Sequence, residues 1–411
     1  MRAMLRIYMS YHLFCVLIVE TYNHSFMEKG CALMVRIREI LALDPLAGFE
    51  LLAGAGGLDN VLTNVTILDY ETDSMDFSAF QKGDFILTSL FFAKDAPQLI
   101  VDAFRELLRR GIAGIAVKTV FYKTLPADML RLADAMNVPV FAYHAASMEE
   151  IILAAHSYML AKEQRELAAM RLDAMLGFGR APSAVAESVR ALDAMLYPHC
   201  VASFSTPREG GALNLGQKMP VPLFSDGQYS AFFPYHDGLL QLYTAADAER
   251  LADAEDAMLR AYESCGVAPA AWRTGFSAPC HAYDFFDAAI RQSLYSNRVC
   301  RCFEKPRLRY GALGVYRFLP ALLEDKSVLA EYRAALTQLR CFEEESGIPM
   351  LDTLSAYAAA HGSVEQAAKR IYQHPNTVRN RVKKARALLA LDGDWYEQIF
   401  ILMGLYALEQ A

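Results

Sequence analysis

Residues 363–389 read SVEQAAKRIYQHPNTVRNRVKKARALL, and this stretch decides how the C-terminal part of the chain folds. Ser363 followed by Gln366 is a pattern of helix N-termini, because each side chain can satisfy a free backbone N–H group of the other. Apolar residues then recur at the spacing of one helix face. They are Val364, Ala367, Ala368 and Ile371. The pattern predicts a short amphipathic helix.

A second helix follows a brief interruption at Gln373, His374 and Pro375. Asn376 can cap this helix, because its side-chain oxygen can accept a hydrogen bond from a backbone N–H of the first turn. One face of the second helix is again apolar. It consists of Val378, Val382, Ala385 and Leu389. Two short helices at this separation predict a helix-turn-helix whose second helix reads DNA.

The other face of the second helix is polar and basic. At about 100° per residue, Asn376, Asn380 and Lys383 point away from the apolar face. Cations lie on both flanks, and an amide between cations can read adenine while the cations hold phosphates. The predicted DNA-binding residues are Asn376, Thr377, Arg379, Asn380, Arg381, Lys383 and Lys384. A solvated basic face is the alternative interpretation.

Charge supports the DNA-binding interpretation, because the basic residues are concentrated locally. The chain has a formal net charge of −7, yet residues 366–391 hold seven Lys or Arg and no Asp or Glu. A basic island on an acidic protein confines any contact with a polyanion to one place. The length of 411 residues predicts two to four domains.

Residues 34–146 alternate between strand and helix patterns, which predicts a mostly parallel α/β sheet. The expected strands are 61–68, 85–89, 112–118 and 138–143, and the expected helices are 98–110 and 126–136. Ligands of open α/β sheets bind beyond the carboxyl ends of the strands. We therefore expect a small-molecule site at Thr88, Ser89, Lys118 and Tyr143, with ordinary loop polarity as the alternative interpretation of each single residue.

The middle of the chain divides into a connector and a third region. Ser147 and Glu150 form a capping box, and no Gly or Pro follows before residue 177, so residues 147–178 predict a long connector helix or dimer contact. Residues 179–340 combine strand and helix patterns, including a hairpin around Asp237-Gly238 and helices at 246–262 and 282–295. They predict an α+β sandwich. Residues 341–411 are the helix-turn-helix domain.

The N-terminal residues 1–33 show no clean period, and we interpret them as an upstream extension or a misassigned start. Their apolar run over residues 13–19 stops at Glu20, whereas a membrane span needs about 20 apolar residues. The sequence therefore predicts a cytoplasmic protein without a membrane partner.

Neither a metal site nor a catalytic site is predicted. The eight cysteines include no CxxC pair, and His199–Cys200 and Cys280–His281 are adjacent pairs rather than zinc-ligand spacings. The expectation is idle or buried thiols, no metal and no cofactor. GxxxxGK[ST], HExxH and GxSxG motifs are absent. Two rival functions stay open: an enzyme acting on a small metabolite through residues 34–146, and a signalling adaptor that binds protein through its basic helix.

The C-terminal motif resembles that of PucR-type regulators, which include purine-catabolism and sugar-diacid regulators. Members typically read His-x-Asn-Thr-(Leu/Val)-x-x-Arg here, and His374, Asn376, Thr377 and Arg381 match. Pro375 stands where many members have arginine. Residues 388–392 and the apolar segment 395–408 also fit the family.

The resemblance extends over roughly residues 34–411. Residues 51–59, 83–89 and 111–117 resemble the sensory domain of the family, and 275–277 and 310–317 resemble its middle domain, which is related to GGDEF nucleotide cyclases. The adjacent glycines Gly210-Gly211 lack the carboxylates a cyclase needs for Mg²⁺. The resemblance thus implies a multidomain α/β fold with an N-terminal sensory domain, a degenerate GGDEF-like α+β domain and an all-α helix-turn-helix domain. It implies a bacterial regulator, not an enzyme. Such a regulator responds to an effector, binds double-stranded promoter DNA as a homodimer or larger oligomer and controls a catabolic or nitrogen-related operon.

Overall fold

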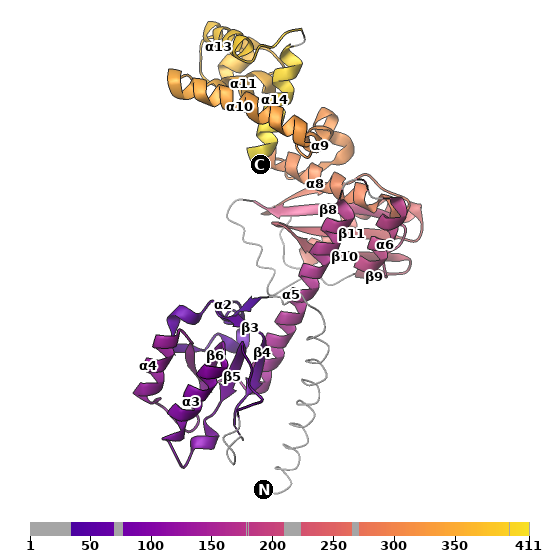
Figure 1. Cartoon of the computed structure of the whole chain (residues 1–411). Coiled ribbons are helices and arrows are strands. Elements are labelled where there is room, and N and C mark those ends of the chain that lie inside the picture. The colour runs from indigo at the N-terminus through magenta and orange to yellow at the C-terminus, as the bar shows by residue number, and fades with distance from the viewer. Residues whose placement is uncertain are drawn as a thin grey trace. The chain divides into compact units, whose positions relative to one another are not determined.

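The computed structural model describes residues 34–69, 77–177, 179, 181–208, 223–264, 271–393 and 395–410 (Figure 1). The chain forms two compact units, residues 1–166 and 167–411. The extension predicted over residues 1–33 and the Gly210-Gly211 pair lie outside the described residues. None of the helices described combines the length and apolarity that crossing a membrane requires.

A five-stranded sheet forms the middle of the first unit, and it is mostly parallel, as predicted. Its order is β2-β7-β6-β5-β4, in which only β2 runs antiparallel to its neighbour. The strands are β2 (Glu50–Ala53), β4 (Asn64–Ile67), β5 (Asp84–Thr88), β6 (Gly114–Lys118) and β7 (Val140–Tyr143). β5 and β6 are buried along almost their whole length, which explains their continuous apolar runs.

Helices cover both faces of this sheet. α3 (Leu99–Arg110) and α4 (Ala127–Met136) pack on one face, close to the predicted ranges. α2 (Ile37–Ile40) and the first half of α5 (Met148–Leu176) pack on the other. Gly111 ends α3 in the left-handed region, where a glycine avoids the strain of a side chain.

The β-branched run over residues 61–68 is not one strand, so this prediction was wrong. β3 (Val61–Leu62) pairs with β1 (Val35–Arg36) in a separate two-stranded sheet, while β4 joins the main sheet. Thr63 lies between them, and its N–H donates to the Gly83 carbonyl oxygen at 2.8 Å. The backbone therefore leaves one sheet and enters the next at this residue.

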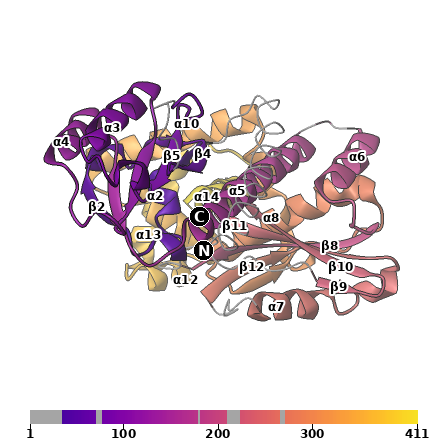
Figure 2. The same ribbon diagram turned by 90° about the horizontal axis from the view of Figure 1, so that it is seen from below.

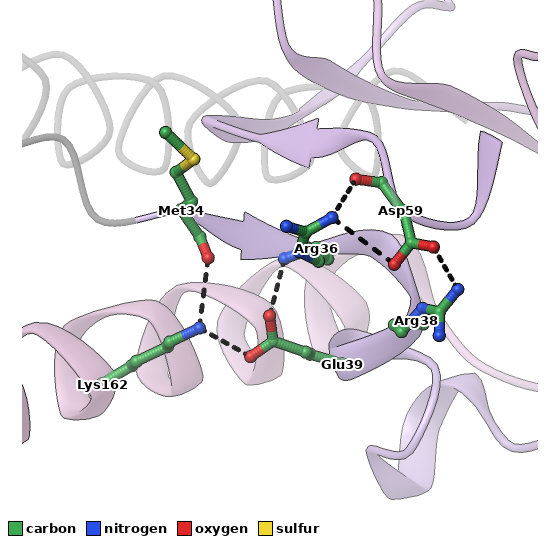
Figure 3. A network of polar contacts seen from close by, with 6 residues as sticks. All are labelled: Met34, Arg36, Arg38, Glu39, Asp59 and Lys162. Atoms are coloured by element: carbon green, nitrogen blue, oxygen red, sulfur yellow. Dashed lines mark hydrogen bonds and ion pairs between the residues drawn. The ribbon is translucent and has the colours of Figure 1, made fainter.

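A polar network fastens Met34 to α5 (Figure 3). Lys162 Nζ donates to Glu39 Oε2 at 2.7 Å and to the Met34 carbonyl oxygen at 3.1 Å. Glu39 also accepts from the Arg36 backbone N–H at 3.0 Å. Burial raises the pKa of Glu39, but hydrogen bonds from Lys162, Arg36 and Tyr158 outweigh burial and hold that pKa below its usual value. The carboxylate therefore stays charged and keeps the network intact near neutral pH.

α5 begins with the predicted capping box. The Ser147 N–H donates to Glu150 Oε2 at 2.9 Å, and the Glu150 N–H donates to Ser147 Oγ at 3.1 Å. The helix continues for 29 residues. Ile151 and Ala155 are buried in a core of the first unit, and Leu172 is buried in a core of the second.

A six-stranded mixed sheet forms the first part of the second unit, in the order β13-β12-β8-β11-β10-β9. β10 and β11 form the predicted hairpin, and His236 in its two-residue turn has the positive φ of 48° that such turns require. The strands are β8 (His199–Pro207), β9 (Leu223–Ser225), β10 (Gln228–Tyr235), β11 (Gly238–Ala245), β12 (Trp272–Phe276) and β13 (Arg307–Arg309).

Helices cover both faces of this sheet as well, and Figure 2 shows α6 and α7 on opposite sides of it. α6 (Pro182–Leu192) and α8 (Phe286–Cys302) pack on one face, and α7 (Ala254–Ser264) packs on the other. The predicted α+β sandwich is therefore one sheet between two helix layers. The helix expected over 246–262 is interrupted, because the short η4 (Ala248–Leu251) precedes α7.

The C-terminal region is all-helical, as predicted (Figure 1). Its helices share one apolar core. They are α9 (Leu319–Leu322), α10 (Lys326–Ser346), α11 (Met350–Ala359), α12 (Val364–Arg370), α13 (Pro375–Leu388) and α14 (Trp395–Gln410). Asp325 caps α10, because its Oδ1 accepts from the N–H groups of Ser327 and Val328. Residue 341, the predicted start of the helical domain, falls within α10.

Gly275 allows β12 to approach α8 closely. A Cβ at this position would lie 2.1 Å from the Asn297 nitrogen and 2.5 Å from the Ser293 oxygen. We therefore expect Gly275→Ala to lower the free energy of unfolding by about 1–3 kcal/mol, as overpacking does. Thermal unfolding followed by circular dichroism measures this. Gly311→Ala is the control, because its Cβ would meet no atom within 4 Å. Equal melting temperatures for the two variants would contradict the close packing.

Candidate nucleic-acid interface

The short helices α12 and α13 carry the predicted DNA-binding residues. Ser363 begins α12 as predicted, because its Oγ accepts from the Gln366 backbone N–H at 3.3 Å. In the turn after α12, Tyr372 adopts a left-handed backbone with φ of 52°, and its side chain is 94% exposed. The turn is short, so α12 and α13 stay adjacent and pack against each other.

The start of α13 differs from the prediction. His374, not Asn376, is the N-cap, and its Nδ1 accepts from the Asn376 backbone N–H at 3.2 Å. Pro375 occupies the first helical position, where the missing N–H removes no helical hydrogen bond. Asn376 therefore lies inside the helix, and its side chain is exposed rather than used as the cap.

Three side chains form the buried face of α13. Val378, Val382 and Ala385 are at most 4% exposed. They share the apolar core with Ala367 and Ala368 of α12. Burying one valine stabilises the fold by about 1.5–3 kcal/mol, so this face fixes how α13 is rotated about its axis. The apolar periodicity predicted this face correctly.

The opposite face of α13 is exposed and polar. Asn376, Asn380 and Lys383 are exposed at the spacing of a single helix face, and Thr377 is half-buried beside them. α13 itself contains no acidic residue. The nearest ion pair joins Arg379 Nη2 to Glu365 Oε1 of α12 at 3.7 Å, between two exposed side chains. Such a pair is weak in water and leaves the arginine available to a stronger anion.

Partners within the protein engage three polar residues of α13, namely Asn376, Arg379 and Lys384. Arg379 Nη1 donates to Asn376 Oδ1 at 2.8 Å, so the amide oxygen of Asn376 is already used. Lys384 Nζ lies 5.6 Å from the centre of the Phe342 ring, within the range of a cation–π contact. Within the described part of the chain, no hydrogen bond or ion pair engages the side chains of Asn380 or Lys383. These two are the residues of the face most free to meet a ligand.

Arg381 points toward α11 rather than toward solvent. Its Nη1 donates to Thr353 Oγ1 at 3.0 Å, and the Thr353 hydroxyl donates to the Pro349 carbonyl oxygen at 2.7 Å. Thr353 is fully buried, and Arg381 is half-buried. The flank position inferred from the helical wheel was right, but this arginine holds α13 against α11.

The arrangement suits the major groove of B-DNA. An α-helix fits this groove, and an amide side chain can pair bidentately with an adenine edge. Lys383 lies about one turn after Asn380 on the same face, and Arg379 directly precedes Asn380, so cations lie on both sides of the Asn380 amide. Cations in these positions can contact phosphates and hold the helix in register.

The residues predicted to bind a small molecule lie together in the first unit. β5, β6 and β7 are adjacent and parallel, so Thr88, Ser89, Lys118 and Tyr143 gather at one edge of the sheet. Asp69, which the sequence reasoning missed, follows β4 at the same edge. Its Oδ1 accepts from Thr88 Oγ1 at 3.2 Å and from Ser89 Oγ at 2.9 Å. The sequence could have indicated Asp69, because this acidic residue directly follows the predicted strand 61–68 of a parallel sheet.

The Asp69 contacts divide the four predicted residues into two pairs. Thr88 and Ser89 are buried, and their hydroxyls are committed to Asp69. Burial raises the pKa of Asp69, and the hydrogen bonds from Ser89 and Thr88 only partly oppose that effect. Tyr143 is 2% exposed, and its hydroxyl has no hydrogen-bond partner among the described residues. Lys118 pairs in register with Tyr143 and is half-buried.

The short turn between α12 and α13 and their shared core define a helix-turn-helix fold. Comparison with known proteins finds two family models that match parts of the chain. Residues 39–159 match the purine catabolism regulatory protein-like family, and residues 350–403 match the PucR C-terminal helix-turn-helix domain. These matches confirm the resemblance to PucR-type regulators: the chain combines a PucR family domain with a PucR C-terminal helix-turn-helix.

Two relatives come from Bacillus subtilis (strain 168). The chain is 25% identical over 135 residues to the purine catabolism regulatory protein, covering 32% of this chain and 25% of that protein. It is 32% identical over 84 residues to the proline-responsive transcriptional activator PutR, covering 20% of each. The matches thus span a quarter or less of these relatives. A solved regulator of polyketide synthase expression from Bifidobacterium adolescentis aligns with 19% identity over 60% of this chain and 98% of that one, but the TM-score of 0.28 supports no conclusion.

Arg381 can be tested as a positioning residue. Arg381→Ala leaves the buried Thr353 hydroxyl without its donor, so we expect the free energy of unfolding to fall by about 1–3 kcal/mol. Urea unfolding followed by Trp395 fluorescence in a Trp272→Phe background reports on the C-terminal core, where Trp395 packs. Lys383→Ala is the control, because an exposed substitution changes stability by only about 0.5 kcal/mol. Equal stabilities of the two variants would show that the Arg381 contact has no structural role.

Proposed function

We propose that this protein is an effector-responsive transcriptional regulator that binds promoter DNA through α13. The observation that carries the proposal is the exposed amide-and-cation face of that helix, held outward by Val378, Val382 and Ala385. The match to the PucR C-terminal helix-turn-helix domain supports it independently. The protein acts in the cytoplasm of a bacterium, where its DNA lies.

The residues of the interface have different roles in this proposal. Asn380 reads a base edge, because its amide is exposed and unengaged. Lys383 and Arg379 contact phosphates, and Lys384 joins them from its place beside Phe342. Asn376 and Thr377 lie at the start of α13, where recognition helices commonly meet base edges. Arg381 positions the helix through Thr353 rather than touching DNA.

The regulator binds as a homodimer or larger oligomer in this proposal, with α5 as the contact. Leu153, Leu160 and Leu167 recur every seventh residue on α5 and are 70%, 39% and 43% exposed. Apolar residues at every seventh position form one half of the heptad pattern by which helices pair with a second copy. Paired helix-turn-helix domains read two half-sites and so recognise a longer sequence than one copy can.

The effector site lies beyond the carboxyl ends of β5, β6 and β7 in this proposal. Tyr143 supplies a buried hydroxyl without a partner, and Lys118 supplies the cation beside it. Together they suit a ligand with an anionic or carbonyl oxygen. The relatives are named for purine catabolism and proline response. By analogy, the proposed effector is a nitrogen-containing metabolite, and the proposed target is a catabolic or nitrogen-related operon.

The region of the six-stranded sheet is a degenerate GGDEF-like domain in this proposal, with no cyclase activity. The mixed sheet between helix layers supports the GGDEF-like fold. The expected lack of cyclase activity rests on Gly210-Gly211, which lie outside the described residues. The relatives are named as a regulatory protein and a transcriptional activator. Turnover of a small metabolite by the chain would favour the alternative, an enzyme built on the first unit.

The DNA contacts are separable by mutation. Asn380→Ala should lose about 1–3 kcal/mol on the cognate site and little on random DNA, because a base contact is lost. Lys383→Ala should weaken both DNAs and reduce the slope of log affinity against log salt by about one, because one fewer counterion is released. Fluorescence anisotropy on cognate and random duplexes at several salt concentrations measures both effects.

Two outcomes of that titration would contradict the proposed roles. If Asn380→Ala weakens cognate and random DNA equally, Asn380 is not the residue that reads the base. If neither variant changes affinity, α13 is a solvated basic face, and the protein-binding adaptor becomes the better account. Gln398→Ala on α14 is the matched control, since its amide already donates to the Asp392 carbonyl oxygen at 3.0 Å.

The effector site can be tested by ligand-induced stabilisation. The full chain is screened by thermal shift against nucleobases, amino acids and sugar acids. Tyr143→Phe should keep the fold, because it removes only a hydroxyl without a partner, and should abolish the shift caused by the active compound. Tyr283 lies in the second unit, where its hydroxyl donates to the Leu196 carbonyl oxygen. Tyr283→Phe is therefore the control and should retain that shift. An undiminished shift in Tyr143→Phe would place the effector elsewhere.

A further inference from the structure

The fold brings together two Cys–His pairs that are far apart in the sequence. Cys200 of β8 forms an antiparallel bridge with Cys280. The Cys200 N–H donates to the Cys280 carbonyl oxygen, and the Cys280 N–H donates to the Cys200 carbonyl oxygen, both at 2.9 Å. This register also brings His199 beside His281, with their Nδ1 atoms 3.1 Å apart. The adjacent pairs that looked idle in the sequence are therefore direct cross-strand neighbours.

The two cysteines face one side of the sheet, and the two histidines face the other, because side chains alternate along extended backbone. Cys200 is buried in the core between the sheet and α6 and α8, and Cys280 packs against the same core. The four side chains do not converge on one point, and the described residues hold no group of three or more metal-ligating side chains. The arrangement is a dithiol, not a zinc site.

The backbone geometry permits a disulfide between these cysteines. Residues that exchange both hydrogen bonds in an antiparallel pair have Cα atoms about 5.5 Å apart. Disulfides join Cα atoms about 4.4–6.8 Å apart, so the Cα separation suits one, but the Cβ atoms of a hydrogen-bonded pair lie farther apart than in a relaxed disulfide, and the bond would be strained and readily reduced. The two side chains are close enough for each thiol to shift the pKa of the other.

Cys280 is the accessible member of the pair. It lines a hollow of about 370 Å³ together with Pro279, His281, Phe285 and Gln292, whereas Cys200 is fully buried behind it. The hydrogen bond from the Cys200 thiol lowers the pKa of Cys280 despite burial, and burial raises the pKa of Cys200. A reagent entering the hollow therefore meets the more acidic thiol first.

The neighbouring cysteines show what an unreactive thiol looks like in this protein. Cys300 Sγ donates to the Thr274 carbonyl oxygen at 3.5 Å, and Cys302 Sγ donates to the Ala407 carbonyl oxygen at 3.4 Å. Burial raises the pKa of Cys300 to about 12 and that of Cys302 to about 11. Both thiols stay protonated, and neither shares a cross-strand bridge with a second cysteine.

We propose that Cys280 and Cys200 form an oxidation site for hydroperoxides, in which Cys280 reacts first and Cys200 closes a disulfide. The Cys280 thiolate attacks the terminal oxygen of the hydroperoxide, the O–O bond breaks, and the alkoxide or hydroxide leaves with a proton from solvent. Cys280 is then a sulfenic acid. The Cys200 sulfur displaces its hydroxyl as water, and the S–S bond forms. Two thiols lose two electrons and two protons, and one hydroperoxide becomes an alcohol, or water when hydrogen peroxide is used, plus one water.

The test is a map of cysteine states in the full chain. Reduced protein is treated with hydrogen peroxide, blocked with iodoacetamide, digested and analysed by mass spectrometry. We expect a peptide pair joined through Cys200 and Cys280 that dithiothreitol separates. Cys200→Ser should leave a Cys280 sulfenic acid that dimedone traps, and Cys280→Ser should yield no disulfide at Cys200. Cys341→Ser, which removes an exposed cysteine, should leave the yield unchanged.

The wild-type map decides the proposal by itself, so a variant that fails to fold does not leave it open. Circular dichroism of each reduced variant identifies such a failure. Full alkylation of Cys200 and Cys280 at a peroxide concentration that oxidises Cys341 would overturn the proposal. So would a disulfide that joins Cys280 to any other cysteine. This site is independent of the proposed DNA binding, because both readouts are chemical states of the sulfur atoms.

Discussion

The burial of Val378, Val382 and Ala385 is the contact on which the proposed activity depends. These side chains set the rotation of α13, and its rotation decides which residues can reach a groove of DNA. The partners of this face come from α12 and the surrounding helices, which share one core with it. A change that rotated α13 by one residue, about 100°, would place Arg379, Lys383 and Arg386 at the buried positions and move Asn380 to a flank. Core packing thus determines which side chains of α13 can reach DNA, and charge acts only among those side chains.

Charge then determines how the exposed face of α13 interacts with DNA. The chain is acidic overall, so a polyanion is repelled by most of it and accepted where the basic residues of α13 gather. Fewer cations of α13 are free to contact DNA than the sequence suggests, because Arg381 donates a hydrogen bond to Thr353 and Lys384 lies over the Phe342 ring. What remains is a small set centred on Asn380 and Lys383. A small set favours modest affinity and makes base reading by the amide more important for choosing a site.

The sequence predicted what depends on local periodicity. The buried and exposed faces of α13, the Ser363 cap and the capping box before α5 all follow from residue spacing within a few turns. The cap of α13 was missed because His374 is an unusual cap and Pro375 looked like an interruption, when it opens the helix. The inward contact of Arg381 was missed because a helical wheel does not show which neighbouring helix lies beside a flank. Asp69 was missed although it directly follows the predicted strand 61–68, whereas the Cys200–Cys280 bridge depends on strand register between distant segments, which residue spacing alone does not reveal.

In the proposed mode of action, α13 reads a specific DNA sequence as part of a paired assembly. Selection from a pool of random duplexes with the full chain, followed by sequencing of the bound fraction, tests this claim most directly. We expect enrichment of two inverted half-sites whose centres lie about 10–10.5 base pairs, or a multiple of that, apart. We also expect that the Asn380→Ala protein loses preference at one base pair in each half-site. A bound fraction with the same composition as the starting pool would contradict the claim.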